Sequence, residues 1–288
     1  MSDRGTGPVH PIASRRMARR LLAGSGAAEV TAYRYPGADA LAVVHALDRT
    51  GRVLVAACPP PTHPLSVVGA ERPSEVRLDV RLESADASVR VTTATAHLLG
   101  VLTWLGADEA AEVLEGRAAG CHCPITGEDP LLSLGEIARA PGGRLGVVRT
   151  ERVMVHDLHG VSGHDLSDLL TPDSAGFIWS DTDILSAQEE VRDLGNTALT
   201  LLCEGVVEGA LAGSLCSHRP VEGLCPSLHG RVLCADIAPE GVTLMHVSTT
   251  CVETIQVALP AGTRRACEVE PFLRDCVQDV LVAQLRRG

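Results

Sequence analysis

The densest group of metal-binding residue types in the chain is Cys121-His122-Cys123, which is followed by Pro124. Cysteine and histidine bind zinc, and cysteine thiolates hold iron–sulfur centres, but a closed site usually has about four ligands. Further donors occur in the second half of the chain, at Cys216, His218, Cys225 and His229. The sequence therefore makes Cys121, His122 and Cys123 candidate metal ligands. Because no matched pair of CxxC motifs accompanies them, a metal site is not the favoured interpretation, and a reactive thiol pair is the alternative.

Two histidines are candidates for binding a cofactor. His63 follows three prolines and Thr62 and precedes Pro64, in a segment where regular structure cannot continue. A histidine in such a loop can be exposed and rigidly held, so His63 is a candidate ligand for haem or a metal, although an ordinary loop histidine is favoured. His97 lies in an extended apolar run. A core histidine with a satisfied hydrogen bond is the favoured interpretation there, and a ligand is the alternative.

A third group of histidines and aspartates lies between residues 156 and 165. Its members are His156, His159 and His164, with Asp157 and Asp165. The HxxH spacing can bind a metal, but the group falls where we expect a linker between domains, which favours a solvated polar loop. The segment Ser162-Gly163-His164-Asp165 lacks the strand–turn–helix context of a nucleophile elbow, so no catalytic triad is predicted.

These residues must be positioned by the elements around them, and the segment 75–105 organises the first half of the chain. From Val76 to Leu82, apolar residues alternate with charged ones, which is the period-2 pattern of a half-buried strand. A turn and a second extended run follow, and this run ends in an apolar block in which Gly100 suits a bulge or a tight bend. Long antiparallel strands with short turns and a glycine kink predict a closed or nearly closed barrel.

The pattern along the chain predicts four segments. Residues 1–13 are expected to be a flexible N-terminus, residues 14–160 a barrel domain, and residues 161–179 a linker. Residues 180–288 are expected to form an α/β domain in the order helix, three-stranded meander, helix. Its first helix opens at Asp181 and carries an apolar stripe that continues to Leu201 or Leu202.

Composition excludes several classes of function. All 25 basic residues are arginine, so Schiff-base lysines, lysine nucleophiles and the phosphate-binding P-loop are excluded. Aromatic residues make up 2%, which leaves a core of Val, Leu, Ala and Cys and argues against base-stacking surfaces for nucleic acids. Residues 151–288 hold 20 acidic residues and 9 arginines, whereas residues 1–150 hold 16 of each. An acidic half repels phosphate backbones and anionic lipids, so we expect no nucleic-acid or membrane partner.

Localisation follows from the absence of recognisable targeting patterns. No apolar run reaches the roughly 18 residues that a membrane-spanning helix needs. The apolar run after the arginine-rich segment 15–20 is too short for a secretion signal. We therefore expect a cytoplasmic protein. The ten cysteines follow no disulfide framework, and small buried thiols are favoured for Cys203, Cys234 and Cys276.

The order of these elements resembles a known family. The hairpin turn at residues 48–51, the proline-rich break, the strand at 75–80 and the long strand to Trp104-Leu105-Gly106 are similar to the split β-barrel of the pyridoxamine-phosphate-oxidase and flavin-reductase type, in particular to actinobacterial members. Residues 230–260 and the closing helix resemble the small α/β domain of haem-utilisation (HugZ-type) proteins and glutamyl-tRNA-reductase-binding proteins. The predicted fold class is α+β, an antiparallel split β-barrel followed by a small α/β domain.

The resemblance implies a homodimer that holds FMN or haem in clefts at the subunit interface. Flavin-binding members commonly place Ser-Arg-Lys-like residues after the third strand to hold the phosphate, whereas residues 60–64 of this chain are Pro-Pro-Thr-His-Pro. Haem-degrading members take an axial histidine from near the C-terminus, whereas the last histidine here is His246. Neither cofactor is supported by its usual residues. The candidate cofactor-binding residues are Arg52, Thr62, His63 and His97.

Three functional hypotheses follow from the sequence. The leading one is a cytoplasmic, homodimeric split-barrel protein that binds haem or a flavin such as FMN, with haem-handling oxidoreductase chemistry as one form of it. The second is a barrel that has lost its cofactor and serves as a binding or regulatory partner of another protein. The third is a Cys/His metal-binding protein. The residues identify no substrate, and whether the protein is an enzyme is left open.

Overall fold

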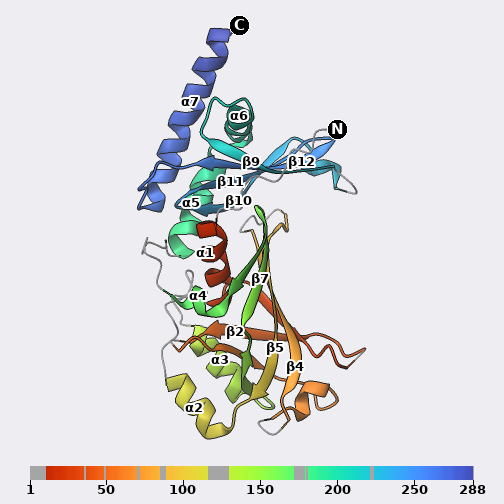
Figure 1. Cartoon of the computed structure of the whole chain (residues 1–288). Helices are drawn as coiled ribbons and strands as arrows, with labels where there is room; N and C mark the ends of the chain where they lie inside the picture. Colours follow the sequence, from red (N-terminus) through yellow and green to blue (C-terminus); the bar gives the residue numbers. More distant parts are fainter. Residues whose placement is uncertain are drawn as a thin grey trace.

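The fold consists of a β-barrel and a second, separate β-sheet, each accompanied by helices (Figure 1). It is seen in a computed structural model of the 288-residue chain, which describes residues 11–35, 37–48, 50–69, 72–84, 89–115, 130–171, 179, 181–220 and 224–287. The barrel and its flanking strands are β1 Ala27–Thr31, β2 Leu41–Leu47, β3 Val53–Ala57, β4 Ser74–Glu83, β5 Thr92–Trp104, β6 Arg144–Arg149, β7 Arg152–Asp157 and β8 Gly160–Asp165.

Six antiparallel strands close the barrel in the order β4-β1-β2-β3-β6-β5, because β5 pairs back onto β4. Strands β7 and β8 continue the sheet outward from β5. The predicted α+β fold class, with an antiparallel barrel, is thereby confirmed. The alternation of β4 is confirmed as well, since Val76, Leu78 and Val80 are completely buried while Arg77 and Arg81 are exposed.

Strand β5 holds the barrel together by pairing with three other strands. It lies along the whole of β4, pairs with β7 through residues 94–97, and pairs with β6 through residues 101–104. Gly100 lies between these last two stretches. A Cβ atom at this position would lie 2.4 Å from the backbone oxygen of Arg149, so the close backbone approach that the sequence predicted here is confirmed.

Helices close the barrel at one end and cover one of its sides. They are α1 Pro11–Leu22, α2 Ala107–Glu115, α3 Pro130–Arg139 and the short α4 Leu166–Leu170. Ala18, Leu21 and Leu22 of α1 belong to the core inside the barrel. Helix α3 packs against the outer face of β2, β3 and β6, and its Leu134 is buried in a smaller core there.

The segment that we expected to be a linker is in part regular structure. Residues 161–165 belong to β8, which pairs with β7 along its whole length, and residues 166–170 form α4. His156 and His164 therefore lie on paired strands, and His159 lies in the turn between them, instead of in a solvated loop. The sequence GVSGHD of β8 contains few strand-favouring residues, so pairing with β7 determines its conformation.

The second sheet has four antiparallel strands in the order β10-β11-β12-β9, with β9 Gly213–Pro220, β10 Arg231–Ala238, β11 Gly241–Val247 and β12 Cys251–Ala258. The predicted three-stranded meander is present as β10 to β12. Strand β9, which the predicted order of helix, three-stranded meander and helix does not contain, adds a fourth strand at the edge. Helices α5 Asp181–Asp193, α6 Asn196–Val207 and α7 Val269–Arg287 contribute to one core with this sheet, as do the 3₁₀ turn Ala266–Glu268 and Trp179.

The helix that the sequence predicted from Asp181 to about Leu202 is two helices. Gly195, which has a φ of 83°, separates α5 from α6. The next residue, Asn196, donates from Nδ2 to the Gly230 oxygen at 2.8 Å and accepts from the Val232 nitrogen at 2.8 Å. These bonds to the start of β10 fix the break, so a continuous apolar stripe did not imply a continuous helix.

Helix α1 joins the barrel to the second sheet (Figure 1). Arg16 donates to Glu240 in the β10–β11 turn, and Arg20 lies 3.2 Å from the Asp236 carboxylate of β10. From the barrel, Ser84 donates to the Cys234 oxygen at 3.3 Å. Among the described residues, no helix combines the length and apolar character that crossing a membrane requires.

Candidate functional site

His97 lies on the outer face of the barrel, not in its core. On β5 the side chains of Ala96 and Leu98 are buried inside, so His97 between them points outward, with about 40% of its side chain exposed. Its Nδ1 lies 2.6 Å from Oδ1 of Asp79, the residue directly opposite on β4. The other oxygen of Asp79 accepts from Arg77 at 2.7 Å. The favoured core interpretation of His97 is therefore wrong, because strand alternation places it outside.

Exposed apolar side chains surround His97 on this face. Its ring meets that of His156 on β7 edge-on, with ring centroids 5.2 Å apart. The nearby Leu99 is 66% exposed, Met154 39% and Val161 54%. We call His97, Leu99, Met154, His156 and Val161 the outer-face patch. Pairing among β5, β7 and β8 brings its members together: Met154 lies opposite His97, and Val161 lies opposite His156.

The buried histidine of the barrel is His45 on β2. Only 2% of it is exposed, and its Nε2 donates to the Leu21 oxygen of α1 at 2.6 Å. Burial lowers the pKa of His45, so it is held in the neutral form. It ties α1 to the barrel wall and has no access to a ligand from solvent.

Both ring nitrogens of His63 are hydrogen-bonded to backbone groups, one in its own loop and one in the segment before β2. Its Nδ1 accepts from the Leu65 nitrogen at 3.1 Å, which caps the 3₁₀ turn Pro64–Val67, and its Nε2 donates to the Asp39 oxygen at 3.0 Å. Since both ring nitrogens are used, binding a metal or haem iron would require breaking one of these bonds. Thr62 beside it is exposed. The geometry agrees with an ordinary loop histidine.

Arg52 likewise has a partner, Asp48, in the hairpin between β2 and β3. Its Nε lies 2.7 Å from Oδ2 of Asp48, while Oδ1 of Asp48 accepts from the Thr50 and Arg52 nitrogens and from the Thr50 hydroxyl. Burial by itself would raise the pKa of Asp48, but these hydrogen bonds and the Arg52 charge outweigh it and lower that pKa. A free guanidinium for a cofactor phosphate is therefore not offered by Arg52.

The predicted metal ligands Cys121, His122 and Cys123 lie outside the described residues. Their proposed supplementary donors are spread over one end of the second sheet. Cys216 and His218 belong to β9, and Cys225 and His229 flank the 3₁₀ turn Pro226–Leu228.

One of these donors, Cys216, meets a residue of the barrel. Its thiol faces the imidazole of His159 in the β7–β8 turn, and Asp157 accepts from the backbone nitrogen of His159 at 2.8 Å. The interaction with Cys216 raises the pKa of His159. Burial would raise the pKa of Cys216, but His159, together with hydrogen bonding from Ser214 and the Gln256 backbone, outweighs burial and lowers it. Nearby, burial raises the pKa of Asp236 despite the charge of Arg20.

A serine–histidine contact occurs at the barrel end of α1. The hydroxyls of Ser14 and Ser162 lie 3.0 and 3.1 Å from Nε2 of His164. Ser14 is 1% exposed, and burial lowers the pKa of His164. Among the described residues, no carboxylate is hydrogen-bonded to the other ring nitrogen, as a triad requires. The contact joins α1 to β8.

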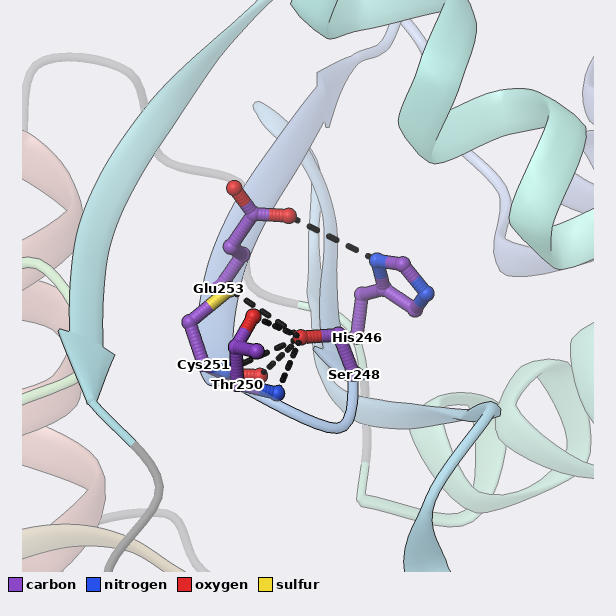
Figure 2. Close-up of polar contacts among 5 residues, drawn as sticks. All are labelled: His246, Ser248, Thr250, Cys251 and Glu253. Atoms are coloured by element: carbon purple, nitrogen blue, oxygen red, sulfur yellow. Dashed lines mark hydrogen bonds and ion pairs between the residues drawn. The ribbon is translucent and has the colours of Figure 1, made fainter.

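The second sheet also carries a cluster of potential metal ligands, of which sequence reasoning named only His218. The ligand atoms of His218, Cys251 and Glu253 all lie within 4.8 Å of one another. His246 lies beside this cluster, with its Nδ1 3.5 Å from Oε2 of Glu253 (Figure 2). No sequence motif marks these residues, because they come from three strands. The period-2 spacing of Cys251 and Glu253 on one face of a strand is the only local signal.

Comparisons with known proteins identify no family. No family model matches the chain, and no curated protein is similar in sequence. Among solved structures, a haem-binding protein from Mycobacterium smegmatis is 14% identical, with a TM-score of 0.46, and the match covers 93% of this chain and 97% of that one. A protein of unknown function from Agrobacterium tumefaciens is 17% identical, with a TM-score of 0.35, and the match covers 96% of this chain and 100% of that one.

Proposed function

We propose that this protein binds haem at the outer-face patch, with His97 as the axial ligand of the iron. The observation that carries the proposal is the pair of His97 and Asp79 on an exposed face of the barrel. Histidines that bind metals usually donate their second ring nitrogen to a carboxylate or a carbonyl, which fixes the tautomer and raises the basicity of the ligand. The bond of Nδ1 to Asp79 fulfils that role and directs Nε2 to the iron.

The Nε2 atom of His97 makes a longer hydrogen bond than the Nε2 atom of His63. Its contact is with the Thr95 hydroxyl at 3.4 Å, close to the longest distance at which a hydrogen bond is counted. By comparison, Nε2 of His63 donates to a backbone oxygen at 3.0 Å. Iron binding at His97 therefore displaces only a weak contact.

The surroundings of His97 match the other two parts of a haem. The porphyrin would contact the exposed apolar side chains of Leu99, Met154 and Val161. Large apolar side chains that gather on a surface are usually covered by a ligand or a partner protein. For the propionates, the exposed Arg81 lies on the same face, opposite Thr95, whereas Arg77, opposite Leu99, is paired with Asp79. An iron ligand, apolar side chains and a cationic partner thus occur on one continuous sheet surface.

A single flat sheet face covers only one side of a porphyrin. We therefore propose that a second copy of the chain covers the other side, which makes the functional form a homodimer. The proposal concerns binding, and it assigns no catalytic residue.

FMN is the less suitable ligand. Of the candidate cofactor-binding residues, Arg52 is paired with Asp48, both nitrogens of His63 are hydrogen-bonded, and Thr62 alone supplies no charge. A phosphate bound there would lack the charge-assisted hydrogen bonds that contribute about 1.5–3 kcal/mol each.

The test is a haem titration of the full-length chain, followed by the Soret band. We expect saturable binding, and we expect His97→Ala to weaken it at least about 10-fold and to change the ligand-field spectrum. Asp79→Asn should weaken binding about 10-fold or more while the protein remains folded. His63→Ala serves as the matched control and should bind haem like the unchanged chain. The proposal is refuted if haem does not bind, or if His97→Ala leaves both affinity and spectrum unchanged.

A further inference from the structure

Four side chains at one end of the second sheet offer the donor atoms of a transition-metal site. His218 lies on β9, His246 on β11, and Cys251 and Glu253 on β12. The donors of His218, Cys251 and Glu253 lie within 4.8 Å of one another, and the imidazole of His246 lies 3.5 Å from Glu253. Figure 2 shows the His246 ring directed toward the Glu253 carboxylate.

Strand register brings these residues together. Glu253 lies directly opposite His218 on β9 and directly opposite His246 on β11. Side chains that face each other across antiparallel strands point to the same face of the sheet, and so do residues two apart on one strand. Cys251 is two residues before Glu253, so all four side chains belong to one face.

The turn between β11 and β12 positions Cys251. The hydroxyl of Ser248 accepts from the backbone nitrogens of Thr250 and Cys251, at 3.1 and 2.9 Å, and donates to the Cys251 oxygen at 3.0 Å. It also lies 3.2 Å from the Cys251 sulfur (Figure 2). A ligand held by a second layer of hydrogen bonds in this way loses little freedom when it binds a metal.

We propose that His218, His246, Cys251 and Glu253 bind one divalent transition-metal ion of the zinc class. Two imidazoles, a thiolate and a carboxylate form a tetrahedral donor set that zinc accepts, whereas calcium and magnesium prefer oxygen ligands alone. Ligand atoms of tetrahedral zinc lie about 3.3–3.8 Å apart, given bonds of about 2.0–2.3 Å. The donor atoms of His218, Cys251 and Glu253, which lie within 4.8 Å of one another, reach this range by small side-chain rotations, and the imidazole of His246 completes the set by turning from Glu253 toward the ion. The two anionic ligands balance the charge of the ion.

This site is independent of the proposed haem function, because none of its residues belongs to the outer-face patch. Because its ligands come from three strands, a bound ion would stabilise the second sheet. A bound ion would link β9, the edge strand of the sheet, to β12 and β11, in addition to their backbone hydrogen bonds. Since the ion binds only the folded arrangement, it should stabilise the fold in proportion to its concentration and affinity.

The experiment is a Co²⁺ titration of the untagged, reduced, full-length chain, with visible absorption as the readout and Zn²⁺ as the competitor. We expect one Co²⁺ per chain, with intense d–d bands of a tetrahedral site and a thiolate charge-transfer band, both removed by Zn²⁺. Cys251→Ser should abolish the charge-transfer band and weaken binding at least about 10-fold. His218→Ala should weaken binding as well, and because His218 is exposed, this variant should keep its circular-dichroism spectrum.

The matched control is the double variant Cys121→Ser/Cys123→Ser, which removes the pair of thiols that the sequence itself suggested as ligands. It should bind Co²⁺ with the same spectrum as the unchanged chain. The proposal is overturned if the thiolate band survives in Cys251→Ser, if it disappears in the double variant instead, or if Co²⁺ binds without tetrahedral bands.

Discussion

Replacing Gly100 by alanine tests whether the barrel closes as described. The new Cβ would lie 2.4 Å from the Arg149 oxygen and 3.0 Å from Cγ1 of Val148. Arg149 of β6 is paired with Val101, which follows Gly100 on β5. The Arg149 carbonyl therefore cannot move away without disturbing the pairing of β5 with β6.

Overpacking a well-filled site costs about 1–3 kcal/mol, and a backbone obstacle places Gly100→Ala in the upper part of this range. Alanine also lowers the entropy of the unfolded chain, which offsets about 0.4–1 kcal/mol. We therefore expect a net loss of about 2 kcal/mol in the free energy of unfolding of the barrel. For a barrel of this size, such a loss corresponds to a decrease of roughly 4–8 °C in Tm.

The assay is urea unfolding followed by the fluorescence of Trp104, whose side chain is buried in the barrel core. A Trp179→Phe background removes the other tryptophan, which lies in the core of the second sheet. The matched control is Gly69→Ala, since nothing lies within 4 Å of a Cβ there, and we expect a change within about 0.5 kcal/mol. Equal unfolding midpoints for Gly100→Ala and Gly69→Ala would refute the proposed role of Gly100 in closure.

Two further predictions concern titrating groups. Burial lowers the pKa of His45 in the folded chain, so the native state binds fewer protons than the unfolded state below about pH 6.5, and stability should decrease as the pH falls through this window. In urea unfolding between pH 7.5 and 5, the free energy of unfolding should decrease less for His45→Gln than for the unchanged chain. An equal pH dependence of this free energy in the two proteins would contradict the role of His45. At Cys216, His159 lowers the thiol pKa, so iodoacetamide should modify it faster than in His159→Gln, as followed by peptide mass spectrometry. Cys203, whose pKa burial raises to about 12, should remain unmodified in both proteins; equal rates at Cys216 would rule out activation by His159.

Much of the fold could be predicted because its pattern is local. The alternation from Val76 to Leu82 placed one face of β4 inside, and Gly100 marked the close approach of β5 to β6. The prediction failed where tertiary contacts override local preference. Asn196 breaks an apolar stripe by bonding to β10, and β8 takes strand form from its pairing with β7.

The candidate sites were less predictable, since a residue type shows what chemistry is available but not what it contacts. His63 and Arg52 were plausible ligands until their partners, Asp39 and Asp48, were known. His97 was recognised as a candidate but placed on the wrong face. The direction of a strand residue depends on which side the barrel closes, and the alternation of β5 is weaker than that of β4.

The sequence by itself determined the strand periods, the glycine and proline breaks, the absence of lysine chemistry and the acidic character of the second half. Those properties follow from the composition and the order of neighbouring residues. Only the tertiary structure decided that His218 meets Cys251 and Glu253, that His159 meets Cys216, and that His97 lies opposite Asp79. Each of these pairs joins different strands or turns, and which of these become neighbours, and in what register, is set by burial of the whole core.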